Sequence, residues 1–109
     1  MFVNHDDCPL EDLGGGVRRR ILAHAGGLMQ VEVHFDEGAV GPLHSHPHEQ
    51  ISYVVSGRVR YFLGDEHADL EPRDLVTIPA GVPHSIQLLS RTVRLADAFH
   101  PVREDFLAG

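Results

Sequence analysis

Residues 38–57 read GAVGPLHSHPHEQISYVVSG: a histidine-rich segment is followed by apolar and β-branched residues, with a glycine at each end. An apolar run bounded by turn residues is typical of a β-strand. Side chains two apart on a strand point to the same face, so His44 and His46 can present two imidazoles together. Gln50 lies four residues after His46, an even spacing that places it on the same face of the strand. This stretch therefore predicts a strand-borne group of polar ligands.

The rest of the chain repeats short runs between turns. Val31, Val33 and Phe35 alternate with polar neighbours, as on a half-buried strand, and no window carries a convincing helical stripe. Strands are expected over residues 17–24, 28–35, 50–55, 58–63, 75–79, 84–89 and 92–99. We expect roughly nine or ten antiparallel strands in all, one helical turn near 9–13 and an irregular tail over 101–109. The predicted fold class is all-β, a closed double sheet or barrel with an interior that a ligand can enter.

The composition is that of one small domain. A chain of 109 residues, 42% apolar and 23% charged, has room for a single core. A single cysteine, the lack of a signal-like N-terminus and the lack of a membrane-length apolar run predict a cytoplasmic protein. The net charge of −7 disfavours nucleic acid and anionic membranes as partners, so an anionic ligand needs a local positive site. All nine basic residues are arginine, which excludes a lysine Schiff base.

A second histidine-bearing segment, IPAGVPH at residues 78–84, follows the first after about thirty residues. If His84 approaches from a neighbouring strand, it joins His44, His46 and Gln50 in a site of three histidines and one oxygen. Such a site holds one divalent transition metal, and Ni, Zn, Mn, Fe and Co all suit these ligands. All four ligands are neutral, so the ion keeps its full charge and the site favours an anion.

Two neighbouring residues leave the ligand set open. His48 has the parity of His44 and His46, but Pro47 interrupts the strand between them. Glu49 has the opposite parity, unless a bulge exchanges it with Gln50. Any one of these histidines could instead be a surface residue of a histidine-rich chain. Ordinary surface or core positions are assigned to His5, His24, His34, His67 and His100.

The two segments resemble the two motifs of the cupin superfamily. The first, about residues 38–57, agrees at Gly38, His44, His46 and Gly57, with Gln50 in place of the usual acid. The second, about residues 73–88, agrees at Pro79, Gly81 and His84 and departs at Arg73 and Leu88, where glycine and asparagine are usual. The resemblance implies a single cupin domain over residues 1–109, a jelly-roll-like double-stranded β-helix, with a metal.

A narrower resemblance, to the KdgF-type small cupins of pectin and alginate degradation, covers most of the chain. It rests on VRRRILA at 17–23, MQVEVHF at 29–35, VGPLHSHPHEQISYV at 40–54 and DAFHPVREDFL at 97–107. It implies an isomerase that converts 4,5-unsaturated monouronates to their linear ketonised form. In that family the catalytic and substrate-binding group falls on Asp97, Phe99 and Arg103, with Asp97 as acid/base.

Other interpretations of these residues stay open. Asp97 could be a solvated or turn-capping residue, Phe99 could belong to the core, and Arg103 could form an exposed ion pair with the acids that follow it. Residues 18–20 are three arginines, and Arg19 points opposite to its neighbours, which favours a charged edge or rim over a nucleic-acid site.

Alternative functions are a cupin dioxygenase and a non-catalytic sugar- or metal-binding cupin. The expected partners are a small anionic sugar and a second copy of the chain. An edge strand and exchange of the N-terminal strand would form this homodimer.

Overall fold

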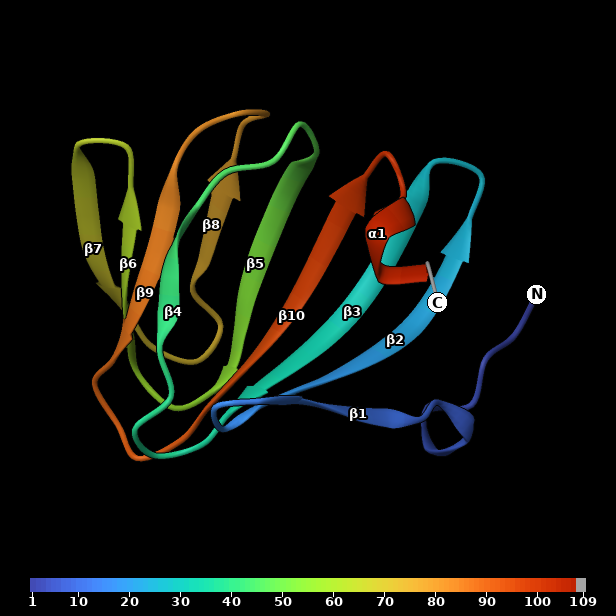
Figure 1. Ribbon diagram of the computed structural model, residues 1–109, viewed down its shortest axis with the longest axis horizontal. Coiled ribbons are helices and arrows are strands. Elements are labelled where there is room, and N and C mark those ends of the chain that lie inside the picture. Colours follow the sequence, from blue (N-terminus) through green and yellow to red (C-terminus); the bar gives the residue numbers. More distant parts are fainter. Residues whose placement is uncertain (108–109) are drawn as a thin grey trace.

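Two antiparallel sheets make up the computed structural model, which describes residues 1–107 (Figure 1). The end of the expected tail and of the expected domain, at 108–109, lies outside the described residues. The elements are η1 (His5–Asp7), β1 (Leu10–Gly14), β2 (Val17–Ala25), β3 (Leu28–Phe35), β4 (Gly41–His44), β5 (Glu49–Ser56), β6 (Val59–Leu63), β7 (Glu66–Leu70), β8 (Leu75–Ile78), β9 (His84–Leu88), β10 (Val93–His100) and α1 (Glu104–Leu107).

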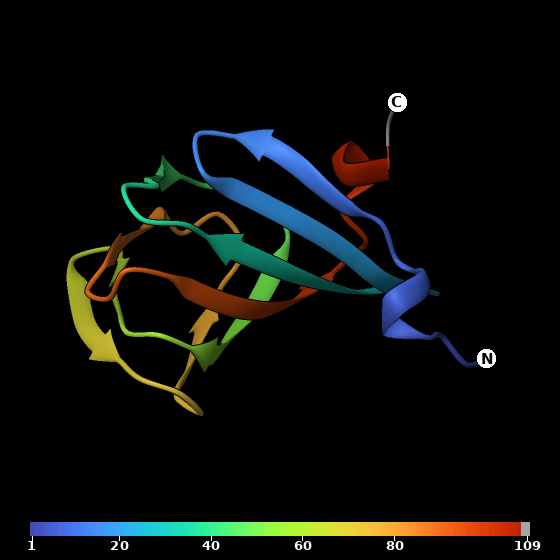
Figure 2. The same cartoon turned by 90° about the horizontal axis from the view of Figure 1, so that it is seen from below.

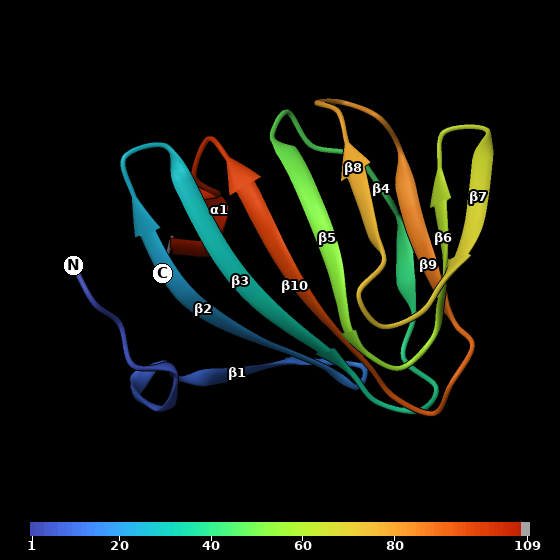
Figure 3. The same ribbon diagram turned by 180° about the vertical axis from the view of Figure 1, so that it is seen from behind.

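The larger sheet has the strand order β1-β2-β3-β10-β5-β8, and the smaller one has the order β4-β9-β6-β7. The sheets curve around a shared interior, as the view turned by 90° shows (Figure 2). Seen from behind, no helix or strand lies over the outer face of the larger sheet along β3, β10 and β5 (Figure 3). The prediction of an all-β fold is therefore confirmed.

The alternation of apolar residues explains how the interior is filled. On β10 every second side chain is buried, from Val93 through Leu95 and Asp97 to Phe99. One core cluster, which includes Val54, Val59, Tyr61 and Ile78, lies between the sheets, and a second, smaller one contains Met29, Val31 and Phe99. A fully buried side chain of this size contributes about 1.5–3 kcal/mol to folding. Asp97 is the exception, a carboxylate in an otherwise apolar row.

Two local predictions are wrong. Residues 10–14 form strand β1, which pairs with β2, and not a helical turn. The helical turn lies earlier, at η1, where the Asn4 side chain accepts a hydrogen bond from the Asp6 N–H. The tail is not wholly irregular, because it contains α1. Glu104 and Asp105 supply negative charge in the first turn of this helix, and Phe106 packs against the second core cluster.

No helix in the part of the chain that the structure describes has the length and apolar character needed to span a bilayer.

Candidate functional site

Three histidine side chains meet between the two sheets. The possible ligand atoms of His44, His46 and His84 all lie within 4.8 Å of one another. His44 ends β4 and His84 begins β9, and the two are register partners in the smaller sheet. Their ring centroids are 4.2 Å apart, and those of His46 and His84 are 4.9 Å apart. The barrel thus brings together the three histidines that the two sequence motifs contain.

His46 reaches this cluster by a route that parity did not predict. Strand β4 ends at His44, so His46 lies in the loop before β5 and not on the same strand. The loop is held by a hydrogen bond of 2.8 Å from the Gly81 N–H to the His46 carbonyl oxygen. That bond joins the two histidine-bearing segments directly. As a result His46 is buried while His44 remains exposed.

The backbone fixes the orientation of all three rings. Each Nδ1 lies at hydrogen-bonding distance from a carbonyl two residues away: His44 to Pro42 at 2.9 Å, His46 to His48 at 3.0 Å and His84 to Val82 at 3.0 Å. Because a carbonyl oxygen only accepts, each Nδ1 carries the proton and each Nε2 keeps its lone pair. His84 Nε2 is buried and has no hydrogen-bond partner among residues 1–107. These are the properties of histidines that bind a metal.

Gln50 completes the group from β5. Its Oε1 lies 2.8 Å from His46 Nε2, and its Nε2 donates to Ser52 Oγ at 3.0 Å. In this arrangement His46 Nε2 and Gln50 Oε1 are two acceptors that face each other. Two such acceptors repel, and a cation bound by both would stabilise their close approach. Two ligands bound at right angles, each about 2.1 Å from one ion, lie roughly 3 Å apart. The donor set therefore fits a divalent metal.

The two ambiguous residues lie outside this group. His48 is not part of the histidine cluster that could hold an ion, although its backbone carbonyl orients His46. The Glu49 side chain is 73% exposed and points away from the interior. No bulge exchanges it with Gln50, which is 6% exposed.

Burial keeps two of the histidines neutral. It lowers the pKa of His46 and of His84, and the positive charge of Arg103 lowers both further. Neutral imidazole is the form that binds a metal, so these residues are ready to do so at neutral pH.

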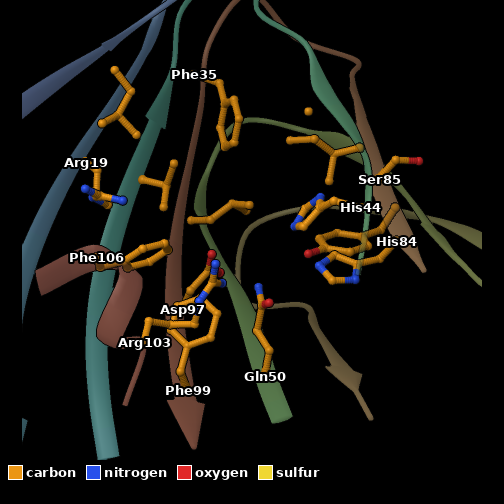
Figure 4. A pocket seen from close by; sticks show the side chains of 16 residues that line it. Arg19, Phe35, His44, Gln50, His84, Ser85, Asp97, Phe99, Arg103 and Phe106 are labelled. Carbon is orange, nitrogen blue, oxygen red and sulfur yellow. The ribbon is translucent and has the colours of Figure 1, made fainter. Parts of the chain in front are cut away.

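A cavity of about 260 Å³ opens beside the histidines (Figure 4). His44, Gln50 and His84 line one side, and Asp97 and residues near the C-terminus line the other. Apolar side chains from both sheets form the wall between them. The cavity can therefore hold a small molecule in contact with both the histidine cluster and the carboxylate.

Asp97 is the only carboxylate among the described residues that line this cavity. It is 6% exposed, and its Oδ1 has no hydrogen-bond partner within the described chain. Burial raises the pKa of Asp97 to about 6, although Ser52, Gln50 and the positive charge of Arg103 oppose the rise. A carboxyl group with such a pKa can both accept and release a proton near neutral pH.

Arg103 forms the expected ion pair and also lines the cavity. Its Nε and Nη2 donate to the two carboxylate oxygens of Asp105 at 3.0 and 2.8 Å, so the ion pair exists. Yet the Arg103 side chain is only 12% exposed and lines the cavity. Its Cζ lies 5.1 Å from the Phe99 ring centroid and 4.2 Å from that of Phe106. The guanidinium is thus held in place from three sides.

Two cavity residues, Arg19 and Phe106, were not among the predicted site residues. Phe106 belongs to α1, which the sequence pattern did not reveal. Arg19, expected at a charged rim, instead faces the interior. It lies in register with Val33 on the inner face, opposite to Arg18 and Arg20. Both line the cavity.

Comparison with known proteins agrees with this geometry. Residues 31–97 match the family model described as "Cupin domain". The chain is 37% identical over 103 residues to the pectin degradation protein KdgF of Dickeya dadantii, covering 94% of each protein. The structure of KdgF from Halomonas sp. superposes with a TM-score of 0.91 at 37% identity, covering 97% of this chain and 99% of that one.

An RmlC-like cupin from Shewanella frigidimarina superposes with a TM-score of 0.90 at 36% identity, over 96% of this chain and 94% of the other. Family model, sequence and structure therefore agree on one assignment. The chain belongs to the cupin family and, within it, to the small single-domain cupins of the KdgF type.

Proposed function

We propose that this protein is a metal-dependent isomerase that converts 4,5-unsaturated monouronates, released by pectin or alginate lyases, to their linear ketonised form. One observation carries the proposal: a single cavity is lined by histidines of the cluster, by the buried carboxylate of Asp97 and by the guanidinium of Arg103. The similarity to a protein named for pectin degradation supports it.

His44, His46, His84 and Gln50 would hold one divalent transition metal. When bound, such an ion supplies positive charge that stabilises negative charge developing on the substrate oxygens. Proton transfer and substrate positioning are carried out by residues of the chain.

Ring opening moves one proton and changes no atom count. Asp97 accepts the proton of the anomeric hydroxyl group, the bond between C1 and the ring oxygen breaks, and C1 becomes an aldehyde. The ring oxygen then carries the electron pair of an enolate across C5 and C4. Asp97 returns a proton to C4, so C5 becomes a ketone and C4 a methylene group. Arg103 binds the substrate carboxylate, and Phe99 forms the wall that positions the ring.

The test uses Asp97→Asn, which keeps the shape of the side chain but cannot accept the proton. Loss of ring-alkene absorbance of a 4,5-unsaturated uronate is followed for both proteins, with spontaneous opening subtracted at each pH. The variant should fold, bind metal by elemental analysis and lose roughly 10²- to 10⁴-fold in rate.

Asp69→Asn is the matched control, because Asp69 is exposed on β7 and pairs with Arg60 outside the cavity. It should keep the wild-type rate. If Asp97→Asn retains more than about half of that rate, Asp97 is not the acid/base. If the wild-type protein does not accelerate the loss of absorbance at all, the proposed activity is wrong.

A further inference from the structure

The cavity contains a second guanidinium, that of Arg19, which contacts the same aromatic ring, Phe106, as Arg103 does (Figure 4). Arg19 lies on β2 in register with Val33, which in turn pairs with Leu95 on β10. This inward-facing row is next to the row that carries Asp97. The Arg19 side chain is 14% exposed, so a charged group has been placed against the interior.

Arg19 has fewer partners than Arg103. Its Nη2 lies 3.4 Å from Glu11 Oε2, a long contact to a carboxylate that is 43% exposed. Its Nε is buried and makes no hydrogen bond to any residue in 1–107. A buried donor without a partner costs free energy, and more so when it is charged. Arg103, by contrast, has two short hydrogen bonds to Asp105.

The two guanidinium groups share one aromatic ring. The Cζ atoms of Arg19 and of Arg103 each lie 4.2 Å from the centroid of Phe106. Cation–π contact fixes both cations in place, but it does not satisfy their hydrogen-bond donors. Two cations at one end of a cavity in a chain of net charge −7 form a local site for an anion.

We propose that Arg19 is a further substrate-binding residue, which forms with Arg103 a two-guanidinium site for the substrate carboxylate. The identity of that substrate as an unsaturated uronate rests on the proposed function. Asp105 engages Nε and Nη2 of Arg103, so Arg103 offers the carboxylate its Nη1 and Arg19 donates the further hydrogen bonds. The pair thereby selects uronates over neutral sugars of the same shape.

Three variants test this assignment. Arg19→Gln removes the charge, Arg19→Lys restores it without the planar fork, and Arg18→Gln changes the next residue of the strand, whose side chain pairs with Asp36 instead. A charge-assisted hydrogen bond to the carboxylate predicts that Arg19→Gln raises KM roughly 10- to 100-fold while kcat changes little. Arg19→Lys should recover part of the loss, and Arg18→Gln should leave both constants unchanged.

Direct binding separates this inference from the proposed activity. D-galacturonate and the neutral sugar D-galactose are titrated into each protein and followed by NMR. Wild type should bind D-galacturonate in preference to D-galactose, and Arg19→Gln should lose that preference. If wild type is inactive yet this pattern appears, the isomerase proposal fails and the anion site stands.

An unchanged KM, or equal binding of D-galacturonate by wild type and Arg19→Gln, overturns the inference whatever the activity. A lower melting temperature with unchanged binding assigns Arg19 a structural role. Should Arg19→Gln not fold, Arg19→Lys and Glu11→Gln decide. The first should weaken D-galacturonate binding. The second, which releases Arg19 from the one acid within its hydrogen-bond reach among residues 1–107, should preserve or strengthen it.

Discussion

At the scale of single residues, burial disfavours the ionised form of Asp97. Its neighbours on the inner face of β10 are apolar, and burial outweighs the favourable effects of Ser52, Gln50 and Arg103 on its pKa. A carboxyl group whose folded pKa exceeds its unfolded pKa destabilises the fold wherever it is ionised. The proposed acid/base is therefore retained at a cost in stability.

Asp97→Asn should accordingly stabilise the metal-free protein at high pH. Below the ordinary pKa of 3.8 the carboxyl group is neutral in both states, and variant and wild type should be equally stable. As the pH rises from 3.8 through about 6, wild type loses stability relative to Asp97→Asn, because the buried carboxyl group must ionise. The full difference in the free energy of unfolding amounts to at most about 3 kcal/mol.

Urea unfolding at pH 4 and pH 8 measures this difference. Asp69→Asn provides a control of opposite sign, because Arg60 holds the pKa of Asp69 below its ordinary value. If Asp97→Asn raises the free energy of unfolding equally at both pH values, burial does not penalise the ionised carboxylate of Asp97.

The histidines yield a second prediction at this scale. His84→Ala should abolish metal binding and activity together, because it removes the buried Nε2 that has no partner in the described chain. His48→Ala should keep most of both, since only its backbone carbonyl orients His46. Elemental analysis of the purified variants gives the answer, and full metal occupancy in His84→Ala would contradict it.

Parity explains what could be predicted at this scale. Gln50, Asp97 and Phe99 face inward because strand alternation places them there. His46 could not be placed by alternation, because Pro47 and the hydrogen bond from Gly81 turn the loop after β4. The residue was identified from its spacing, but its position depends on a contact about 35 residues away along the chain.

At the scale of elements, two pieces of the fold had no signal in the sequence. Strand β7 is exposed at nearly every position, so it lacks the alternation of a half-buried strand and depends on pairing with β6. Helix α1 has four residues, too few for a periodic stripe, and is anchored by the packing of Phe106. The seven strands expected from short runs between turn residues all appear, with each end shifted by at most one residue.

The turn between β5 and β6 gives a prediction about an element. Gly57 has φ +82°, and a Cβ there would lie 2.2 Å from the Thr92 carbonyl oxygen. Gly57→Ala should cost at least about 2–3 kcal/mol, because it combines backbone strain with a clash against a fixed atom. Gly15→Ala, at φ +62° with no atom within 4 Å of the added Cβ, should cost about 1 kcal/mol. Thermal unfolding of both variants compares them, and equal losses would show that Thr92 can move.

At the scale of the whole molecule, the N-terminal segment and one sheet face remain uncovered. Met1, Phe2 and Val3 are exposed and extend away from the barrel (Figure 1). On the outer face of the larger sheet, the apolar side chains of Ile51 and Leu75 are also exposed. Buried against a second copy, such surfaces would be removed from water.

We therefore predict a two-fold homodimer. Light scattering at micromolar concentration should give a mass near twice the 12.0 kDa of one chain. Replacing Phe2 and Ile51 by serine should shift the mass toward the monomer without loss of fold, because neither side chain is part of the core. A mass near 12.0 kDa for the wild-type protein would refute the prediction.

The three imidazoles differ from the rest of the cavity in how they are held. Each is oriented by a carbonyl two positions away, so each ring and its supporting carbonyl lie within one tripeptide. The walls instead come from strands and a helix far apart along the chain. Substitutions in the apolar walls should therefore leave the orientation of each imidazole unchanged, while the pairing of β4 with β9 and the Gly81 hydrogen bond keep the three rings together.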